Sequence, residues 1–204
     1  FHGAYSRTDS YFSNSIYASS GMPTAEEMAL LEPFRDSLPP EIFTQSFSLP
    51  ASDGKGFNRE NLLKARDLLK EAGYVVRDKK LVNATTGKPL EIEFLLSSSN
   101  FERIVSPYLR NLERLGIRAR IRTVDASQYQ TRLEQYDFDI IVHVYGQSLF
   151  PGNEQRNYWT SEKADQPGGQ NYIGIKNPAV DAMVEKIISA HSMEELTTAT
   201  HALD

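Results

Sequence analysis

Three apolar runs, separated by two segments with helical spacing, dominate the middle of this sequence. The runs occupy residues 90–96, 117–124 and 138–144. The first separator repeats apolar residues every three or four positions, and the second does so at Tyr129, Leu133 and Tyr136. Strands that alternate with helices of about 10–15 residues favour parallel βαβ units. The sequence therefore predicts an α/β fold whose βαβ units are flanked by helices.

Helix start signals predict further helices on both sides of this region. The capping residues are Thr24, Asn58, Asn177 and Ser192. Each can accept a backbone N–H that the first turn of a helix leaves free. The helix after Asn58 is expected over residues 59–72, and Gly73 then ends it in a left-handed conformation. Residues 74–77 and 80–83 are predicted to form a β-hairpin.

Proline complicates the helix between the first two apolar runs. Asn100 is a candidate cap for this helix, but Pro107 lies inside the pattern. Either the helix bends at Pro107, or its regular part begins with Ser106 as cap and Pro107 at the first position. In both cases Gly116 is expected to end it.

The first quarter of the chain is predicted to be less regular than the rest. Residues 33–56 carry four prolines and form a long connection without a repeating pattern, which is uncommon inside one compact domain. We expect residues 1–56 to form an irregular wrapping segment with one short helix, and residues 57–204 to form an α/β ligand-binding lobe. Its last helix still runs where the sequence stops, so a truncated C-terminal end is expected.

Composition excludes several functional classes. The net charge is −5 and no basic run exceeds Lys79-Lys80, which argues against a nucleic-acid partner. No apolar run approaches the ~20 residues of a membrane span, so no direct membrane insertion is expected. We expect no signal peptide within this sequence, because it opens without an apolar segment. It contains no cysteine, and its histidines lack metal-ligand spacing. We therefore expect neither a metal site nor a cofactor.

The candidate ligand-binding site is the segment that follows the third apolar run. In open α/β sheets, ligands bind beyond the carboxyl ends of the strands. The predicted ligand-binding residues are Tyr145, Gln147, Ser148, Asn153, Glu154, Arg156, Tyr158, Trp159, Asn171 and Tyr172. Amide and hydroxyl groups suit a peptide-like ligand, Glu154 suits an ammonium group and Arg156 a carboxylate. The alternative is a long solvated loop in which Trp159 is anchored in the core.

Catalysis is not favoured. His143 with Asp139 and Ser148 resembles a triad, but no G-x-S-x-G surrounds Ser148. Asp139 and His143 are four residues apart on a predicted strand, hence roughly 13 Å apart. We predict a protein that is not an enzyme. A hydrolase using His143 and the following loop, and a non-catalytic interaction module, remain the alternatives.

Several stretches resemble one protein family along nearly the whole chain. They are Leu30-Leu31-Glu32-Pro33-Phe34-Arg35, Thr86-Gly87-Lys88-Pro89-Leu90, Leu112-Glu113-Arg114-Leu115-Gly116-Ile117, Tyr136-Asp137-Phe138-Asp139 and Asn177-Pro178-Ala179-Val180-Asp181. The sequence is thereby similar to the family 5 extracellular solute-binding proteins of ABC importers, in their YejA-type branch, which binds oligopeptides and microcin C.

This resemblance implies a periplasmic-binding-protein type II-like C-terminal lobe with a mixed sheet. It also implies capture of a peptide or peptide-like solute between two lobes, delivery to a membrane permease, a periplasmic location and a monomeric full-length protein. In oligopeptide-binding members an acidic residue anchors the amino terminus of the peptide. Pro151 aligns with that position, so the anchor is either displaced to Glu154 or absent.

Overall fold

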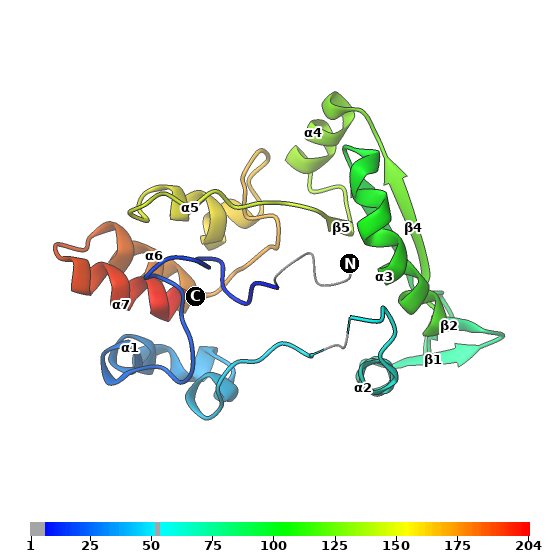
Figure 1. Ribbon diagram of the computed structural model, residues 1–204, viewed down its shortest axis with the longest axis horizontal. Helices are drawn as coiled ribbons and strands as arrows, with labels where there is room; N and C mark the ends of the chain where they lie inside the picture. Colours follow the sequence, from blue (N-terminus) through cyan, green and yellow to red (C-terminus); the bar gives the residue numbers. More distant parts are fainter. Residues whose placement is uncertain (1–6, 52–53) are drawn as a thin grey trace. The chain divides into compact units, whose positions relative to one another are not determined.

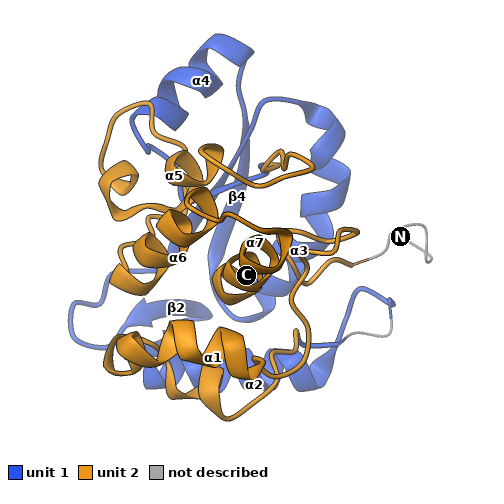
Figure 2. Cartoon of the chain, turned by 90° about the vertical axis from the view of Figure 1, so that its left-hand side faces the viewer, with its two compact units in different colours: residues 1–5, 50–143 blue, residues 6–49, 144–204 orange. Residues whose placement is uncertain are grey.

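A computed structural model of the chain describes residues 7–51 and 54–204, which form two compact units (Figures 1 and 2). Unit 1 comprises Pro50–His143, and unit 2 combines residues 7–49 with Val144–Asp204. This division does not follow the predicted boundary after residue 56, because Phe12 and Tyr17 are buried in the core of unit 2. Residues 1–6 and 52–53 of the predicted wrapping segment lie outside the described residues.

Unit 1 is built on a parallel sheet. Its strands are β3 (Glu91–Leu96), β4 (Arg118–Thr123) and β5 (Ile140–Ile141), in the order β4-β3-β5. Helix α3 (Glu102–Arg114) connects β3 to β4, and α4 (Ala126–Glu134) connects β4 to β5. The predicted βαβ arrangement is confirmed. The third strand is much shorter than its apolar run, since only two of its residues pair with β3.

The two faces of this sheet differ in chemistry. Phe94 and Leu96 of β3 pack with Val105 and Leu112 of α3 in the core of unit 1, and Figure 1 shows α3 lying along the sheet. Because strand side chains alternate between faces, the intervening positions of β3 and β4 point to the opposite face. That second face carries two glutamates of β3 and three arginines of β4.

A helix and a hairpin complete unit 1. Helix α2 (Arg59–Glu71) is capped by Asn58, whose side chain accepts the backbone N–H of Asn61, and the predicted end at Gly73 is confirmed. Strands β1 (Tyr74–Arg77) and β2 (Lys80–Asn83) form the predicted antiparallel hairpin. Its two turn residues have positive φ angles, as the turns that match the strand twist require.

Helix α3 corrects the prediction around Pro107. The short 3₁₀ helix η3 (Ser99–Phe101) precedes it and is capped by Ser98. The N-cap residue of α3 is Phe101, which makes no side-chain capping bond, so the predicted cap at Asn100 is wrong. The helix then runs from Glu102 through Pro107, so a start at Ser106 is wrong. Pro107 has no backbone N–H to donate within the helix. Next to it, the hydroxyl of Ser106 donates to Glu102 O at 2.6 Å.

Unit 2 is helical. Its α-helices are α1 (Ala25–Leu31), α5 (Glu154–Trp159), α6 (Pro178–Ile188) and α7 (Met193–Leu203). Its 3₁₀ helices are η1 (Glu32–Ser37), η2 (Pro40–Phe43) and η4 (Ser161–Ala164). The caps predicted at Thr24, Asn177 and Ser192 are all present. Sequence reasoning missed η1 and η2, because proline-rich segments of this kind lack a repeating apolar pattern.

Histidine joins α7 to α1 in unit 2. One ring nitrogen of His201 lies 2.9 Å from Glu27 Oε1, and the other lies 2.8 Å from Ile16 O. The second oxygen of Glu27 accepts the backbone N–H of Thr24 at 2.9 Å, which closes the capping box of α1. Glu27 is buried, so one carboxylate fixes both the start of α1 and its contact with α7.

Candidate ligand-binding site

The segment predicted to bind ligand is more structured than a loop. Residues 145–172 contain α5 and η4, and many of their polar side chains bond to one another. The alternative predicted from sequence, a solvated loop with Trp159 anchored in the core, is correct for Trp159, which is 4% exposed. The environment of each predicted residue therefore decides which groups remain available to a ligand.

Four aromatic rings pack together at this place. Tyr145 and Trp159 have ring centroids 4.6 Å apart, and Tyr158 lies 5.1 Å from Tyr145. Tyr11 adds an edge contact to Trp159 at 4.8 Å. The Tyr158 hydroxyl donates to Gly146 O, and the Tyr145 hydroxyl donates to Gln170 O. This cluster fixes the backbone on both sides of α5 and brings in Tyr11, which the sequence analysis did not select.

A chain of amide groups leads from Trp159 to Gln147. The indole Nε1 of Trp159 donates to Gln155 Oε1 at 2.7 Å, and Gln155 Nε2 donates to Gln147 Oε1 at 2.7 Å. Gln155 is fully buried and was missed, because a glutamine inside a short helix carries no recognisable pattern. Gln147 Nε2 ends the chain as a buried donor without a hydrogen-bond partner among the described residues.

Glu154 lies directly beside this unsatisfied amide. Its Oε1 accepts hydrogen bonds from Ser148 Oγ at 2.8 Å, Gly152 N at 3.0 Å and Gln155 Nε2 at 3.3 Å. Burial raises the pKa of Glu154, but these hydrogen bonds and that of its own backbone outweigh burial, so the pKa is lowered overall. Glu154 is therefore ionised at neutral pH, and the bonds from Ser148, Gly152 and Gln155 all go to Oε1.

Arg156 is already engaged by another carboxylate. Its Nε and Nη2 donate to the two oxygens of Glu185 on α6, at 2.7 and 2.6 Å. This bidentate contact raises the pKa of Arg156 and lowers that of Glu185. Arg156 and Asn153 line a pocket of ≈ 550 Å³ together with Glu185. A ligand carboxylate would have to displace Glu185 before it could use the same fork.

Asn171 is fully buried and serves the backbone around it. Its Nδ2 donates to Thr160 O and Ile175 O, and its Oδ1 accepts Ile175 N at 3.0 Å. The side chain thus holds the segment after η4 in place, while its neighbour Tyr172 is only half-buried. These contacts give Asn171 a structural role that its residue type alone did not reveal.

The residues of the hydrolase alternative are engaged elsewhere. Asp139 Oδ2 accepts the backbone N–H of Glu93 at 2.8 Å. Ser148 Oγ donates to Phe150 O and Glu154 Oε1. Burial lowers the pKa of His143. Within residues 7–51 and 54–204, no group of three or more His, Asp or Glu side chains could hold a metal ion, and no helix is long and apolar enough to cross a membrane.

Comparison with known proteins identifies the family. The sequence profile of the bacterial extracellular solute-binding proteins, family 5 Middle, matches residues 1–167. The chain is 46% identical over 203 residues to the probable peptide-binding protein YejA of Agrobacterium fabrum, and covers 33% of that protein. It is 38% identical to the peptidoglycan-binding protein YepA of the same organism, again covering 33%. The chain therefore spans about a third of the length of these relatives.

Solved structures agree with this assignment at the level of the fold. The oligopeptide-binding protein AppA of Bacillus subtilis, in complex with a nonapeptide, matches with a TM-score of 0.59 at 19% identity. The match covers 87% of this chain and 36% of AppA. The predicted binding-protein fold is thus confirmed, and the family match and the relatives confirm the resemblance seen in the sequence. The chain belongs to the family 5 bacterial extracellular solute-binding proteins.

Proposed function

We propose that this chain is part of the substrate-binding component of an ABC importer, and that it captures peptides or peptide-like solutes. The relatives' names, peptide-binding and peptidoglycan-binding, both denote ligands that contain peptide bonds. Microcin C belongs to the same chemical class. In this proposal the whole protein is a periplasmic monomer that closes two lobes around its ligand and delivers it to a membrane permease. Its role is binding, without catalysis.

One observation carries the proposal: an ionised carboxylate lies beside a buried amide donor that has no hydrogen-bond partner in the part of the chain that the structure describes. Glu154 Oε1 and Gln147 Oε1 are both bonded to the same nitrogen, Gln155 Nε2, so the two side chains are neighbours. A buried donor without a partner is costly, and a ligand carbonyl would satisfy Gln147 Nε2. An ammonium group on the same ligand would meet Glu154. A peptide amino terminus offers both groups within one residue.

Tyr145 and Tyr158, packed on the buried Trp159, complete this proposed site as a rigid wall. Aromatic side chains provide contact area at low conformational cost, and here they are already packed against one another. Exposed apolar side chains follow at Leu149 and Phe150, which are 88% and 63% exposed. They suit the apolar side chains of a peptide, whereas the polar pair recognises its main chain. Ser148 then acts by holding Glu154.

Titration with trialanine tests this function in the chain itself. Trialanine is expected to shift the side-chain NH₂ signal of Gln147 in ¹H–¹⁵N NMR spectra, assigned through Gln147→Ala. Replacing Glu154 with Gln should weaken trialanine binding about tenfold, because a charge-assisted hydrogen bond becomes a neutral one. Acetylating the amino terminus of trialanine should weaken its binding to the wild type by a similar factor.

The matched control is Glu162→Gln, which removes the same charge from an 80% exposed side chain of the same segment. Its affinity for trialanine should equal that of the wild type. Acetylated trialanine should bind Glu154→Gln no more weakly than it binds the wild type, because the two changes remove the same contact. Equal binding of trialanine and its acetylated form to the wild type, or no shift of the Gln147 signal, would contradict the proposal.

A further inference from the structure

On the charged face of the sheet in unit 1, β4 carries three arginines but β3 carries only two glutamates, so one arginine has no glutamate opposite it. Register places Glu91 opposite Arg118, Glu93 opposite Arg120, and Leu95 opposite Arg122. The first two arginines bind their glutamates, with Arg118 Nη1 2.5 Å from Glu91 and Arg120 Nη2 2.9 Å from Glu93. Arg122 faces a buried leucine instead. No carboxylate on β3 is available to it.

Arg122 lines a pocket between the sheet and α4. The pocket has a volume of ≈ 740 Å³, and its lining includes Arg120, Arg122, Gln128, Thr131 and Arg132. It lies on the charged face of the sheet, between Glu93 of β3, α4 and the segment that leads into β5. This pocket belongs entirely to unit 1.

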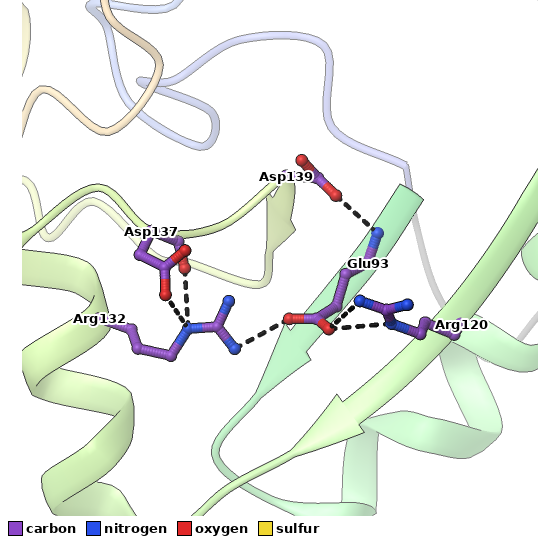
Figure 3. A network of polar contacts seen from close by, with 5 residues as sticks. All are labelled: Glu93, Arg120, Arg132, Asp137 and Asp139. Atoms are coloured by element: carbon purple, nitrogen blue, oxygen red, sulfur yellow. Dashed lines mark hydrogen bonds and ion pairs between the residues drawn. The ribbon is translucent and has the colours of Figure 1, made fainter. Parts of the chain in front are cut away.

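Every carboxylate of the pocket already has a donor (Figure 3). Arg120 and Arg132 approach Glu93 from opposite sides, at 2.9 and 2.8 Å. Asp137 Oδ2 accepts Arg132 Nε at 2.8 Å, and Asp139 Oδ2 accepts the backbone N–H of Glu93. Among the pocket's charged side chains, Arg122 is the one that has no hydrogen-bond or ion-pair partner in the described part of the chain.

We propose that this pocket binds a small anion that carries carboxylate or phosphate groups, with Arg122 as its principal contact. A guanidinium fork matches both groups with two parallel hydrogen bonds. Arg120 Nε and Nη2 both contact Glu93. Because the Arg120 side chain is 62% exposed, the remaining N–H groups of its guanidinium can donate to a second oxygen of the anion. The exposed amide of Gln128, on the first turns of α4, supplies a neutral donor.

This site is independent of the function proposed for Glu154 and Gln147, since it uses none of their contacts. Its sequence signal is the alternation Arg118-x-Arg120-x-Arg122 set against Glu91-x-Glu93-x-Leu95. When the two strands pair in register, Arg122 lies opposite Leu95 and has no glutamate opposite it. The arginine without a glutamate opposite it therefore follows from strand register. The pocket in which it lies is lined by three arginines and three carboxylates.

Calorimetric titration of the chain with succinate and with inorganic phosphate, at matched low ionic strength, tests the proposal. The wild type is expected to bind at least one of them, and the stronger binder identifies the anionic group. Arg122→Gln should weaken that binding at least about tenfold, since it removes a bidentate charged contact. Arg118→Gln removes the same charge from the same strand and face but lies outside the pocket, so its affinity should stay within about twofold.

The comparison of these two variants decides the outcome. Equal weakening by Arg118→Gln and Arg122→Gln would mean a general charge effect and overturn the site. So would full retention of binding by Arg122→Gln, or the absence of binding of both anions to the wild type. Circular dichroism of the variants checks that each remains folded. Because Arg122 is exposed and has no hydrogen-bond or ion-pair partner among residues 7–51 and 54–204, its replacement should leave the fold intact.

Discussion

Replacing Gly116 with alanine should destabilise the chain by about 3–4 kcal/mol. Gly116 ends α3 with a φ of 83°, a conformation that costs an L-residue ~1–2 kcal/mol. A Cβ at this position would lie 2.9 Å from the backbone N of Leu81 and 3.3 Å from the backbone C of Lys80. Such overpacking adds ~1–3 kcal/mol. Urea unfolding followed by circular dichroism measures the loss.

The contact is tight because the hairpin pairs with this turn. Leu81 N donates to Gly116 O at 2.8 Å, and Leu81 is part of the core of unit 1. Moving the hairpin away from a new Cβ would therefore break both the hydrogen bond and the packing.

The matched control is Gly73→Ala. Gly73 also follows a helix and has a φ of 85°, but a Cβ there would meet nothing within 4 Å. It should lose only the ~1–2 kcal/mol of backbone strain. An equal loss of stability in the two variants would show that the close approach of Leu81 to Gly116 does not limit the side chain at position 116.

Features set by neighbours in the sequence could be predicted from it. The caps at Thr24, Asn58 and Ser192 each involve a residue three positions away, which a pattern search can see. The apolar runs likewise gave the parallel strands in order. The third run pairs at only two residues. The length of a strand depends on the partner strand with which it pairs, and the composition of the apolar run alone does not predict that pairing.

Features set by distant partners could not be predicted in the same way. Arg156 has the residue type that binds a ligand carboxylate, but its guanidinium already donates to Glu185, which is 29 residues later in the sequence. Asn171 has the residue type of a ligand-binding side chain but satisfies backbone groups. Gln147 became a stronger candidate because a buried Gln155 takes its oxygen and leaves its nitrogen unsatisfied. Residue type proposes a site, and the surrounding hydrogen bonds decide which atoms remain available.

Replacing Glu93 with glutamine is the second change with a large expected effect. The Glu93 side chain is 8% exposed and bonds to Arg120 and Arg132 (Figure 3). Removing one partner from a buried ion pair leaves the other charge uncompensated, at a cost of ~3–5 kcal/mol. Here Arg120 is 62% exposed and Arg132 retains Asp137, which reduces the loss. We expect Glu93→Gln to cost about 2–3 kcal/mol in urea unfolding at pH 7.

The matched control is Glu91→Gln, on the same strand and the same face of the sheet. Glu91 is 41% exposed and its partner Arg118 is 60% exposed, so water screens the pair. Exposed ion pairs contribute ~0–1 kcal/mol, and Glu91→Gln should cost about 0.5 kcal/mol or less. A similar loss in the two variants would show that burial of Glu93 adds nothing to its ion pairs.

Lowering the pH should remove the difference between Glu93→Gln and the wild type. Burial raises the pKa of Glu93, but its hydrogen bonds to Arg132 and Arg120 and their charges outweigh burial and lower it below the ordinary value of 4.5. A carboxyl group whose pKa is lower in the folded state stabilises that state above its unfolded pKa, and this stabilisation is lost as the pH falls through the folded pKa. The wild type should therefore lose stability below pH 4.5 more steeply than Glu93→Gln, which has no proton to gain at this position. Parallel unfolding free energies of the two proteins between pH 7 and pH 3 would contradict an ionised, paired Glu93.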